Sequence, residues 1–262
     1  KYLTCFRLTP YAPGFLLRFP DIGKAEVLPD YKEEPLFARV FLEAERWGEV
    51  IGCRNVSDLN RTIENGTISS LIDTAEALHE KKLAHIADVV HEQEPKIRMI
   101  CISGPSSAGK TTFMKRLLVQ MRVNGIRPVT ISLDDYYRDR REYAPDGKND
   151  FEDLSALDTD LFQQSILDLL AGKPVHLPRF NFVSGERAWD AEETRLGGNQ
   201  PVIVEGLHAL NPELTRFVPG YQRVNIYLGA LTQLSINAHN RISTSDTRLL
   251  RRMVRDSQFR SN

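Results

Sequence analysis

Residues 104–111 read Gly-Pro-Ser-Ser-Ala-Gly-Lys-Thr, which fits the pattern G-x-x-x-x-G-K-[ST]. The preceding run at 99–103, Met-Ile-Cys-Ile-Ser, is short and apolar, as is typical of a buried strand. The run at 110–123 has helical spacing, and Gly125 stands where a helix would end. Its apolar face consists of Phe113, Leu117 and Met121. The sequence therefore predicts a strand, a glycine-rich turn and the start of a helix in succession.

This arrangement predicts a phosphate-binding loop. The glycines let successive backbone N–H groups point at phosphate oxygens, and the helix N-terminus adds a favourable potential for an anion. Lys110 can reach the β- and γ-phosphates, and the Thr111 hydroxyl can hold Mg²⁺. We therefore expect ATP and Mg²⁺ at these residues: Gly104, Pro105, Ser106, Ser107, Ala108, Gly109, Lys110, Thr111 and Thr112. The alternative is an accidental glycine-rich turn. The loop alone does not decide whether the protein is a kinase, a switch or a motor, because all three use it.

Composition places the chain among ordinary globular proteins. Of its 262 residues, 41% are hydrophobic and 26% are charged, and a formal net charge of −1 favours neither nucleic acid nor a membrane surface. The three cysteines are far apart and odd in number, which argues against a disulfide framework and favours the cytoplasm. No apolar run approaches the ~20 residues of a membrane-spanning helix. Because the chain lacks an initiator Met and stops after an arginine-rich helix, we expect a piece of a longer protein.

Strand and helix signals alternate after the loop. Strands are expected at 129–133, 202–204 and 224–228, and helices at 159–170 and from Ser245 onward, with an extended excursion at 176–189 between them. This alternation predicts an α/β fold of the P-loop NTPase type, whose parallel sheet is covered by helices on both faces. Ligands then bind at the carboxyl ends of the strands.

A polar, proline-containing segment at 92–96 precedes the first core strand and marks a domain boundary. Upstream of it, helical patterns follow an irregular or β-rich start. We therefore predict a smaller, mainly helical α+β accessory domain at 1–95. The phosphate-loop domain is expected at 96–262, incomplete at its C-terminal end.

Acidic residues follow two of the expected strands. Asp134 and Asp135 come after the second strand, where a carboxylate can accept a proton from an attacking hydroxyl or hold Mg²⁺ through water. A helix N-cap is the alternative, and the residues alone do not separate the two readings. Glu205 ends the third strand and precedes Gly206, a position that suits support of Mg²⁺.

The last helix carries arginines on one face. Arg248, Arg252 and Arg255 are spaced i, i+4 and i+7, and such side chains can offset charge on a transferring phosphoryl group. The alternative is a solvated basic face. The density of arginines favours the first interpretation, because six of them follow residue 240 against two aspartates.

From about residue 97 onward, several ordered motifs resemble the uridine kinase/phosphoribulokinase family of P-loop kinases. Residues 103–112 resemble its phosphate loop, and Ser-Leu-Asp-Asp-Tyr-Tyr at 132–137 resembles a segment whose aspartate is the catalytic base. The other matches are the sugar-side segment with Asp150-Phe151-Glu152-Asp153 and Ala156-Leu157-Asp158, Glu205-Gly206, and the lid helix at 246–256. The resemblance implies that Asp134 is the base. It also implies that Arg252, Arg255 and Arg260 are lid arginines, with Arg260 near the nucleotide.

The resemblance places Tyr137, Glu152, Phe180 and Arg187 at the acceptor substrate. Two departures concern uracil recognition. Uridine kinases have Tyr-Asp-Phe and then His-x-Arg in the excursion, whereas this chain has Phe180 and, at the histidine position, Gly185. Glu152 also replaces the usual aspartate near the sugar. The preference for uridine therefore does not follow from the resemblance.

The segment before residue 96 resembles the TGS and editing-type domains of threonyl-tRNA synthetase, as in bacterial uridine kinase-like nucleoside kinases with an N-terminal extension. Residues 39–90, including 56–60 and 76–82, resemble the C-terminal part of that extension. It leaves RNA as an alternative partner through the extension, although the near-neutral charge counts against RNA. A homo-oligomer is compatible with the sequence.

These observations lead to one functional prediction. We expect transfer of the γ-phosphoryl group of ATP to a hydroxyl of a nucleoside or similar small molecule. Asp134, Lys110, Arg252 and Arg255 are the expected catalytic residues, and Thr111 and Glu205 the expected metal ligands. The alternatives are a kinase for a sugar or sugar phosphate, and an NTP-driven regulator associated with RNA or ribosomes.

Overall fold

The structure is a computed structural model that describes residues 5–11, 14–21, 27–31, 33, 35–143, 152–229, 234–237 and 239–259. The chain divides into two compact units, residues 1–47 and 48–262. Asp150, Phe151 and Arg260, which the sequence motifs singled out, lie outside the described residues. Within the described part, no helix is both long and apolar enough to cross a membrane.

The first unit contains one antiparallel hairpin and most of a helix. Strands β1 (Arg7–Tyr11) and β2 (Gly14–Arg18) pair with Leu8 opposite Leu17. Helix α1 (Pro35–Val50) runs across the division between the units. The expected irregular or β-rich start followed by a helix agrees with this order.

The second unit is built on a parallel sheet of four strands. These are β3 (Met99–Ser103), β4 (Val129–Ser132), β7 (Val202–Glu205) and β8 (Arg223–Tyr227), in the spatial order β4-β7-β3-β8. All four expected strands are therefore present, and β3 has the predicted bounds. The register brings Ile102 opposite Glu205 and Ser132 opposite Glu205, so three strands end at the same edge.

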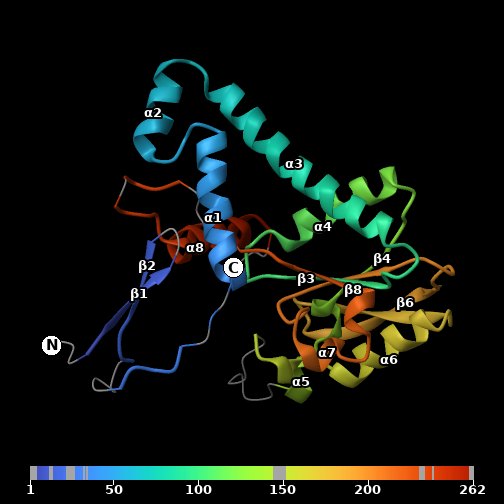
Figure 1. Ribbon diagram of the computed structural model, residues 1–262. Helices are drawn as coiled ribbons and strands as arrows, with labels where there is room; N and C mark the ends of the chain where they lie inside the picture. Colours follow the sequence, from blue (N-terminus) through green and yellow to red (C-terminus); the bar gives the residue numbers. More distant parts are fainter. Residues whose placement is uncertain are drawn as a thin grey trace. The chain divides into compact units, whose positions relative to one another are not determined.

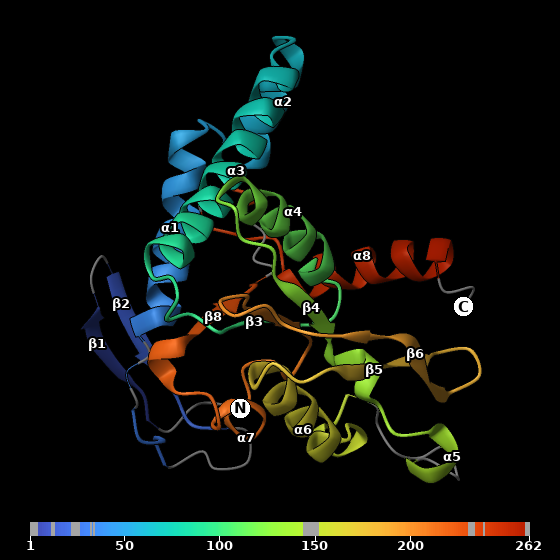
Figure 2. The ribbon, with the colours of Figure 1, turned by 90° about the vertical axis from the view of Figure 1, so that its right-hand side faces the viewer.

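Helices cover both faces of this sheet, as predicted (Figures 1 and 2). One face carries α3 (Ile68–Glu92) and α4 (Lys110–Val123), and the other carries α6 (Thr159–Leu170) and α7 (Pro212–Thr215). Alternate residues of β3 point to opposite faces, because side chains of a strand alternate. Ile100 and Ile102 pack against α3 and α4, whereas Met99 and Cys101 join the cluster around α6.

Helix α4 has the bounds that the sequence predicts. Its buried residues are Phe113, Leu117 and Met121, and together with Leu83 and Ala87 of α3 they form one core cluster. Because α3 belongs to this core, the second compact unit includes residues upstream of 96. The accessory domain at 1–95 stays a prediction.

The remaining elements surround the edge where the strands end. A 3-10 helix, η1 (Leu133–Tyr136), follows β4 directly, and α5 (Arg140–Tyr143) follows η1. The expected excursion is a hairpin of β5 (Val175–Asn181) and β6 (Glu186–Thr194). Two short 3-10 helices, η2 (Leu154–Ala156) and η3 (Gly220–Gln222), and helix α2 (Val56–Glu64) complete this unit's described elements.

Helix α8 (Thr244–Phe259), the lid helix by resemblance, begins before the residue expected to cap it. The sequence predicts Ser245 as the cap, but Ser243 Oγ accepts the backbone N–H of Asp246 at 3.3 Å. Ser243 is therefore the capping residue, since a cap's oxygen satisfies an N–H group in the first turn. With Ser243 and Ser245 both available, the spacing of apolar residues could not separate the two.

Candidate active site

The phosphate loop lies between β3 and α4 and has a backbone that few residues tolerate. Gly109 precedes α4 with φ +93°, and Ser107 has φ +62°, both in the left-handed region. A Cβ on Gly104 would lie 2.7 Å from the Leu228 carbonyl oxygen, so this position requires glycine. The two glycines of the motif therefore meet two different steric needs.

The loop fits phosphate groups. Ser107 Oγ is buried and has no hydrogen-bond partner in the part of the chain that the structure describes. Lys110 Nζ donates to the carbonyl oxygens of Gly104 at 3.0 Å and Pro105 at 3.4 Å, which holds the ammonium over the loop. An unsatisfied hydroxyl, a lysine and a helix N-terminus together form a site for an anion with several oxygens.

Glu205 connects three elements at the carboxyl edge of the sheet. Thr111 Oγ1, in the first turn of α4, donates to Glu205 Oε1 at 3.2 Å, and Ser132 Oγ of β4 approaches the same oxygen at 3.5 Å. A Cβ on Gly206 would lie 2.6 Å from Leu133 Cβ. Glycine after Glu205 therefore lets η1, which carries Asp134, pack against the end of β7.

The environment of Glu205 disfavours its charged form. Burial raises the pKa of the Glu205 carboxyl, and the negative charge of Asp134 raises it further. The Lys110 ammonium and the hydroxyls of Thr111 and Ser132 act in the opposite direction without cancelling the rise. A cation bound here would favour the ionised carboxylate. The oxygen donors of Thr111 and Glu205 suit Mg²⁺, which prefers oxygen ligands.

Asp134 and Asp135 are adjacent in sequence but occupy different environments. Asp134 lines the cavity beside the loop. The Asp135 carboxylate instead accepts hydrogen bonds from the Arg179 guanidinium at 3.1 Å and from the Phe180 backbone N–H at 3.2 Å. Asp135 therefore ties η1 to the β5–β6 hairpin, and these contacts of Asp135 are not those of a helix N-cap.

Helix α8 reaches the phosphate loop through arginines. Arg248 Nε donates to the Ser106 carbonyl oxygen at 3.3 Å, and Arg251 Nε donates to that of Ser107 at 3.2 Å. Arg252 Nη1 lies 3.7 Å from Glu152 Oε1. One face of the lid helix thus contacts both the loop and a residue expected at the acceptor.

These groups enclose one cavity of about 850 Å³. Its lining contains Ser106, Ser107, Gly109, Lys110, Thr111, Thr112, Asp134, Tyr137, Arg140, Glu152, Phe180, Phe182, Glu205, Leu207, Arg251, Arg252 and Arg255. The cavity brings together most of the residues singled out from the sequence. It also includes four that sequence reasoning missed, namely Arg140, Phe182, Leu207 and Arg251.

Some expected site residues lie elsewhere. Gly104, Pro105 and Ala108 shape the loop without lining the cavity. Arg187 also lies outside the lining, and its Nη1 pairs with Asp158 Oδ2 at 3.0 Å, so this guanidinium joins β6 to the N-cap residue of α6. Its contact with an acceptor stays a prediction.

A model of the phosphoribulokinase/uridine kinase family matches residues 99–261. The chain belongs to this family. Among members of the family, the uridine kinase of Schizosaccharomyces pombe is 30% identical over 169 residues, which are 63% of this chain but 33% of that protein. The uridine kinase of Staphylococcus carnosus is 29% identical over 164 residues, 62% of this chain and 69% of that protein.

A solved structure supports the fold assignment for this family member. The protein from Silicibacter sp. TM1040, named as a candidate fructose transport system kinase, matches with a TM-score of 0.50 and 21% identity, over 67% of this chain and 82% of that chain. The family match begins at residue 99. The comparisons do not support the synthetase-like extension that we expected before residue 96.

Proposed function

We propose that this chain is an ATP- and Mg²⁺-dependent kinase that phosphorylates a hydroxyl of a nucleoside or a similar small molecule. The observation that carries the proposal is the convergence of Lys110, Asp134 and Arg252 on one cavity. A phosphate-binding group, a candidate base and a lid cation are the parts that phosphoryl transfer needs.

In the proposed reaction, the loop N–H groups and Lys110 hold the β- and γ-phosphates of ATP. Asp134 accepts the proton of the acceptor hydroxyl as its oxygen bonds to the γ-phosphorus. The bond from that phosphorus to the bridging oxygen of ADP breaks, which yields ADP and a phosphomonoester. Arg252 and Arg255 offset the charge on the transferring group. Mg²⁺, held by Thr111 and Glu205, neutralises phosphate charge when bound.

Uridine and cytidine are not expected to be the best acceptors. A site that hydrogen-bonds a polar ligand discriminates steeply, because a wrong ligand leaves buried groups unpaired. Phe180 has no hydroxyl, and its ring packs against that of Tyr137 with centroids 5.6 Å apart. Phe180 therefore offers no hydrogen bond to a base at this position.

The test is an acceptor panel. ADP formation would be measured with MgATP and each of uridine, cytidine, ribose, ribose 5-phosphate and glycerate, with the Lys110→Ala variant as a control for contaminating kinases. The proposal predicts that at least one small acceptor accelerates ADP formation and becomes phosphorylated. If RNA stimulates ATP hydrolysis and no small acceptor does, the result would instead support the alternative of an NTP-driven regulator associated with RNA. Location in the cytoplasm and assembly as a homo-oligomer stay predictions.

A further inference from the structure

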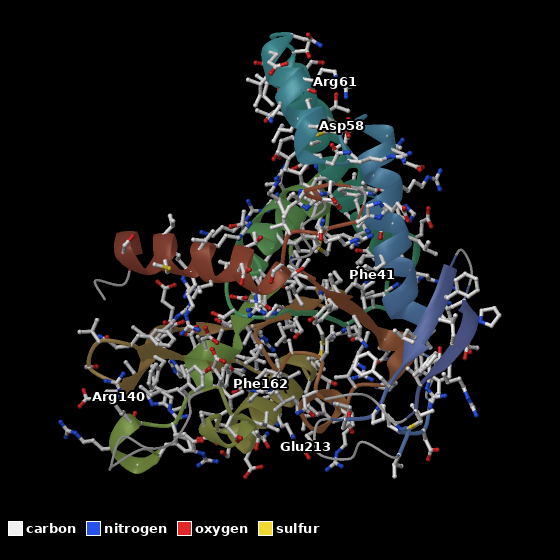
Figure 3. The ribbon with its side chains drawn as sticks, turned by 90° about the vertical axis from the view of Figure 1, so that its left-hand side faces the viewer. Phe41, Asp58, Arg61, Arg140, Phe162 and Glu213 are labelled. Atoms are coloured by element: carbon white, nitrogen blue, oxygen red, sulfur yellow. The ribbon has the colours of Figure 1, made fainter. Side chains whose placement is uncertain are left out.

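The residue Arg140 gives the cavity a cation that the sequence motifs did not identify. It begins α5 (Figure 3), six residues after Asp134 on the same segment of chain. It also lines the cavity. The neighbouring residues of the lining are aromatic. The rings of Tyr137, Phe180 and Phe182 contact one another with centroids 5.2 to 6.2 Å apart. We call these three rings and Arg140 the hairpin wall.

Arg140 is fixed to the turn between β5 and β6. Its backbone N–H donates to the Gly185 carbonyl oxygen at 2.9 Å, and its Nη2 donates to the Phe182 carbonyl oxygen at 3.2 Å. The preceding residue, Asp139, accepts the Arg187 backbone N–H at 2.7 Å. Three hydrogen bonds therefore join the start of α5 to the hairpin, and the guanidinium has a defined place in the wall.

Arg140 fills the space of a side chain that Gly185 lacks. Gly185 has φ +73°, and a Cβ there would lie 2.8 Å from Arg140 Cβ and 3.1 Å from Arg140 Nε. A histidine at residue 185, as in the uridine kinase pattern, is thus excluded by the arginine. Where the resemblance would give a histidine on the hairpin turn, this chain has Gly185 with the Arg140 side chain of α5 beside it.

This difference changes which acceptor the wall can recognise. A guanidinium is always charged, has five N–H donors and has no acceptor, so it can donate to the Phe182 carbonyl oxygen and to a ligand at the same time. Its strongest partners are carboxylate and phosphate oxygens, which it binds through charge-assisted, often bidentate, hydrogen bonds. The three aromatic rings of the wall do not require a charged partner, and they favour an apolar or flat part of the ligand.

We infer that Arg140 selects an acceptor that carries an anionic carboxylate or phosphate group in addition to the hydroxyl that is phosphorylated. The inference rests on the proposed kinase function, because it assumes that the acceptor hydroxyl reaches Asp134. It also explains why the uracil-reading residues are replaced together, since Phe180 and Gly185 belong to the same hairpin.

The experiment compares matched acceptors in wild type, Arg140→Gln and Arg141→Gln. Ribose 5-phosphate is compared with ribose, and glycerate with glycerol. The first pair tests recognition of a phosphate group, and the second tests recognition of a carboxylate. Arg141 is the matched control, because it is the next arginine of α5, is highly exposed, lies 3.7 Å from Glu186 and does not line the cavity. Arg140→Lys tests whether charge alone rescues the function. Thermal unfolding confirms that each variant is folded.

In wild type, one anionic acceptor should exceed its neutral partner in kcat/KM by about tenfold or more, as expected from one charge-assisted contact. Arg140→Gln should reduce this ratio about ten- to a hundred-fold, mainly through a higher acceptor KM, whereas Arg141→Gln should retain it. Arg140→Lys should restore part of it. The inference would be overturned if wild type preferred the neutral acceptors, or if Arg140→Gln left the ratio unchanged. It would also be overturned if Arg140→Gln changed only the KM for ATP. None of these results would contradict the proposed kinase function. Absence of phosphorylation with these acceptors and with the nucleosides of the panel would overturn the proposed function and this inference with it.

Discussion

Thr111 Oγ1 donates a hydrogen bond to Glu205 Oε1 across 3.2 Å and so joins the first turn of α4 to the end of β7. The two residues are far apart in sequence, but the parallel register of β3 and β7 brings both to the carboxyl edge of the sheet. The hydroxyl and the carboxylate are thus placed together before any metal binds. Because Glu205 is buried, this hydrogen bond also satisfies part of a group that would be costly to leave unpaired.

Glu205 should give the nucleotide-free protein a recognisable pH dependence. Its folded-state pKa is raised above the ordinary value, so the folded state holds the proton more tightly than the unfolded state. The contribution of Glu205 to the free energy of unfolding is therefore fully present below the ordinary pKa, and it is lost as pH rises through the folded-state pKa. Each pH unit between the unfolded and folded pKa values corresponds to about 1.4 kcal/mol. Glu205→Gln should therefore gain stability relative to wild type between acidic and neutral pH.

Urea denaturation of wild type and Glu205→Gln across this pH range measures the effect. With MgATP present, the variant should gain less stability than wild type, because an amide binds Mg²⁺ less well than a carboxylate. A wild type that becomes more stable relative to the variant as pH rises would contradict the account of this carboxyl group.

Lys110 should control nucleotide affinity without supporting the core. Lys110→Ala removes a charge-assisted contact to the phosphates, so ATP should bind about ten- to a hundred-fold more weakly. The melting temperature of the nucleotide-free protein should change little, since Lys110 belongs to neither core cluster. Titration calorimetry measures the affinity, and Lys115→Ala, an exposed lysine on the same helix, is the control. Equal affinity in wild type and Lys110→Ala would exclude the loop as the phosphate site.

Asp135 should matter for stability and acceptor binding rather than for the chemical step. Asp135→Ala removes the partner of Arg179 and the acceptor for the Phe180 N–H, which should cost about 1–3 kcal/mol of unfolding free energy. Because Phe180 lines the cavity, the KM for the acceptor should rise more than kcat falls. Denaturation and steady-state kinetics give both values. A large fall in kcat at unchanged stability would show that Asp135 takes part in the reaction.

Arg252 should act on the transition state. Its guanidinium lies 3.7 Å from the Glu152 carboxylate and lines the cavity. Arg252→Ala should lower kcat by about a hundredfold or more, with a smaller effect on the KM for ATP. Arg122→Ala, an exposed arginine at the end of α4, is the control. If both variants lower kcat equally, removing a positive charge anywhere near the site has the same effect, and Arg252 has no specific role.

The sequence predicted the sheet, the phosphate loop and α4 because these depend on local patterns. A short apolar run, two glycines with special backbone needs and a helical spacing each identify their own element. The same local patterns placed Thr111 in the first turn of the helix and Glu205 at the end of a strand. Their direct hydrogen bond did not, because strand order decides it.

Arg140 and Arg251 could not be predicted in the same way. Arg140 lies on the short polar helix α5, which has no periodic signal, and its role depends on a hairpin that is distant in sequence. Arg251 lies on α8, and its contact with the Ser107 carbonyl oxygen depends on how that helix meets the loop. The resemblance assigned the base to Asp134, whereas the contacts of Asp135 with Arg179 and Phe180 depend on the position of β5 and could not be predicted. The sequence showed that Gly185 lacks a side chain, but nothing in it indicated that Arg140 fills that space.

The central claim is that Asp134 accepts the proton of an acceptor hydroxyl during phosphoryl transfer. The most direct measurement is a single-turnover reaction with γ-labelled ATP and the best acceptor from the panel, in wild type and Asp134→Asn. We predict that label moves from ATP to the acceptor in wild type and that the variant transfers it about 10²–10⁴-fold more slowly, with near-normal ATP binding. Transfer at a similar rate in both proteins, or label released to water regardless of the acceptor, would contradict this role.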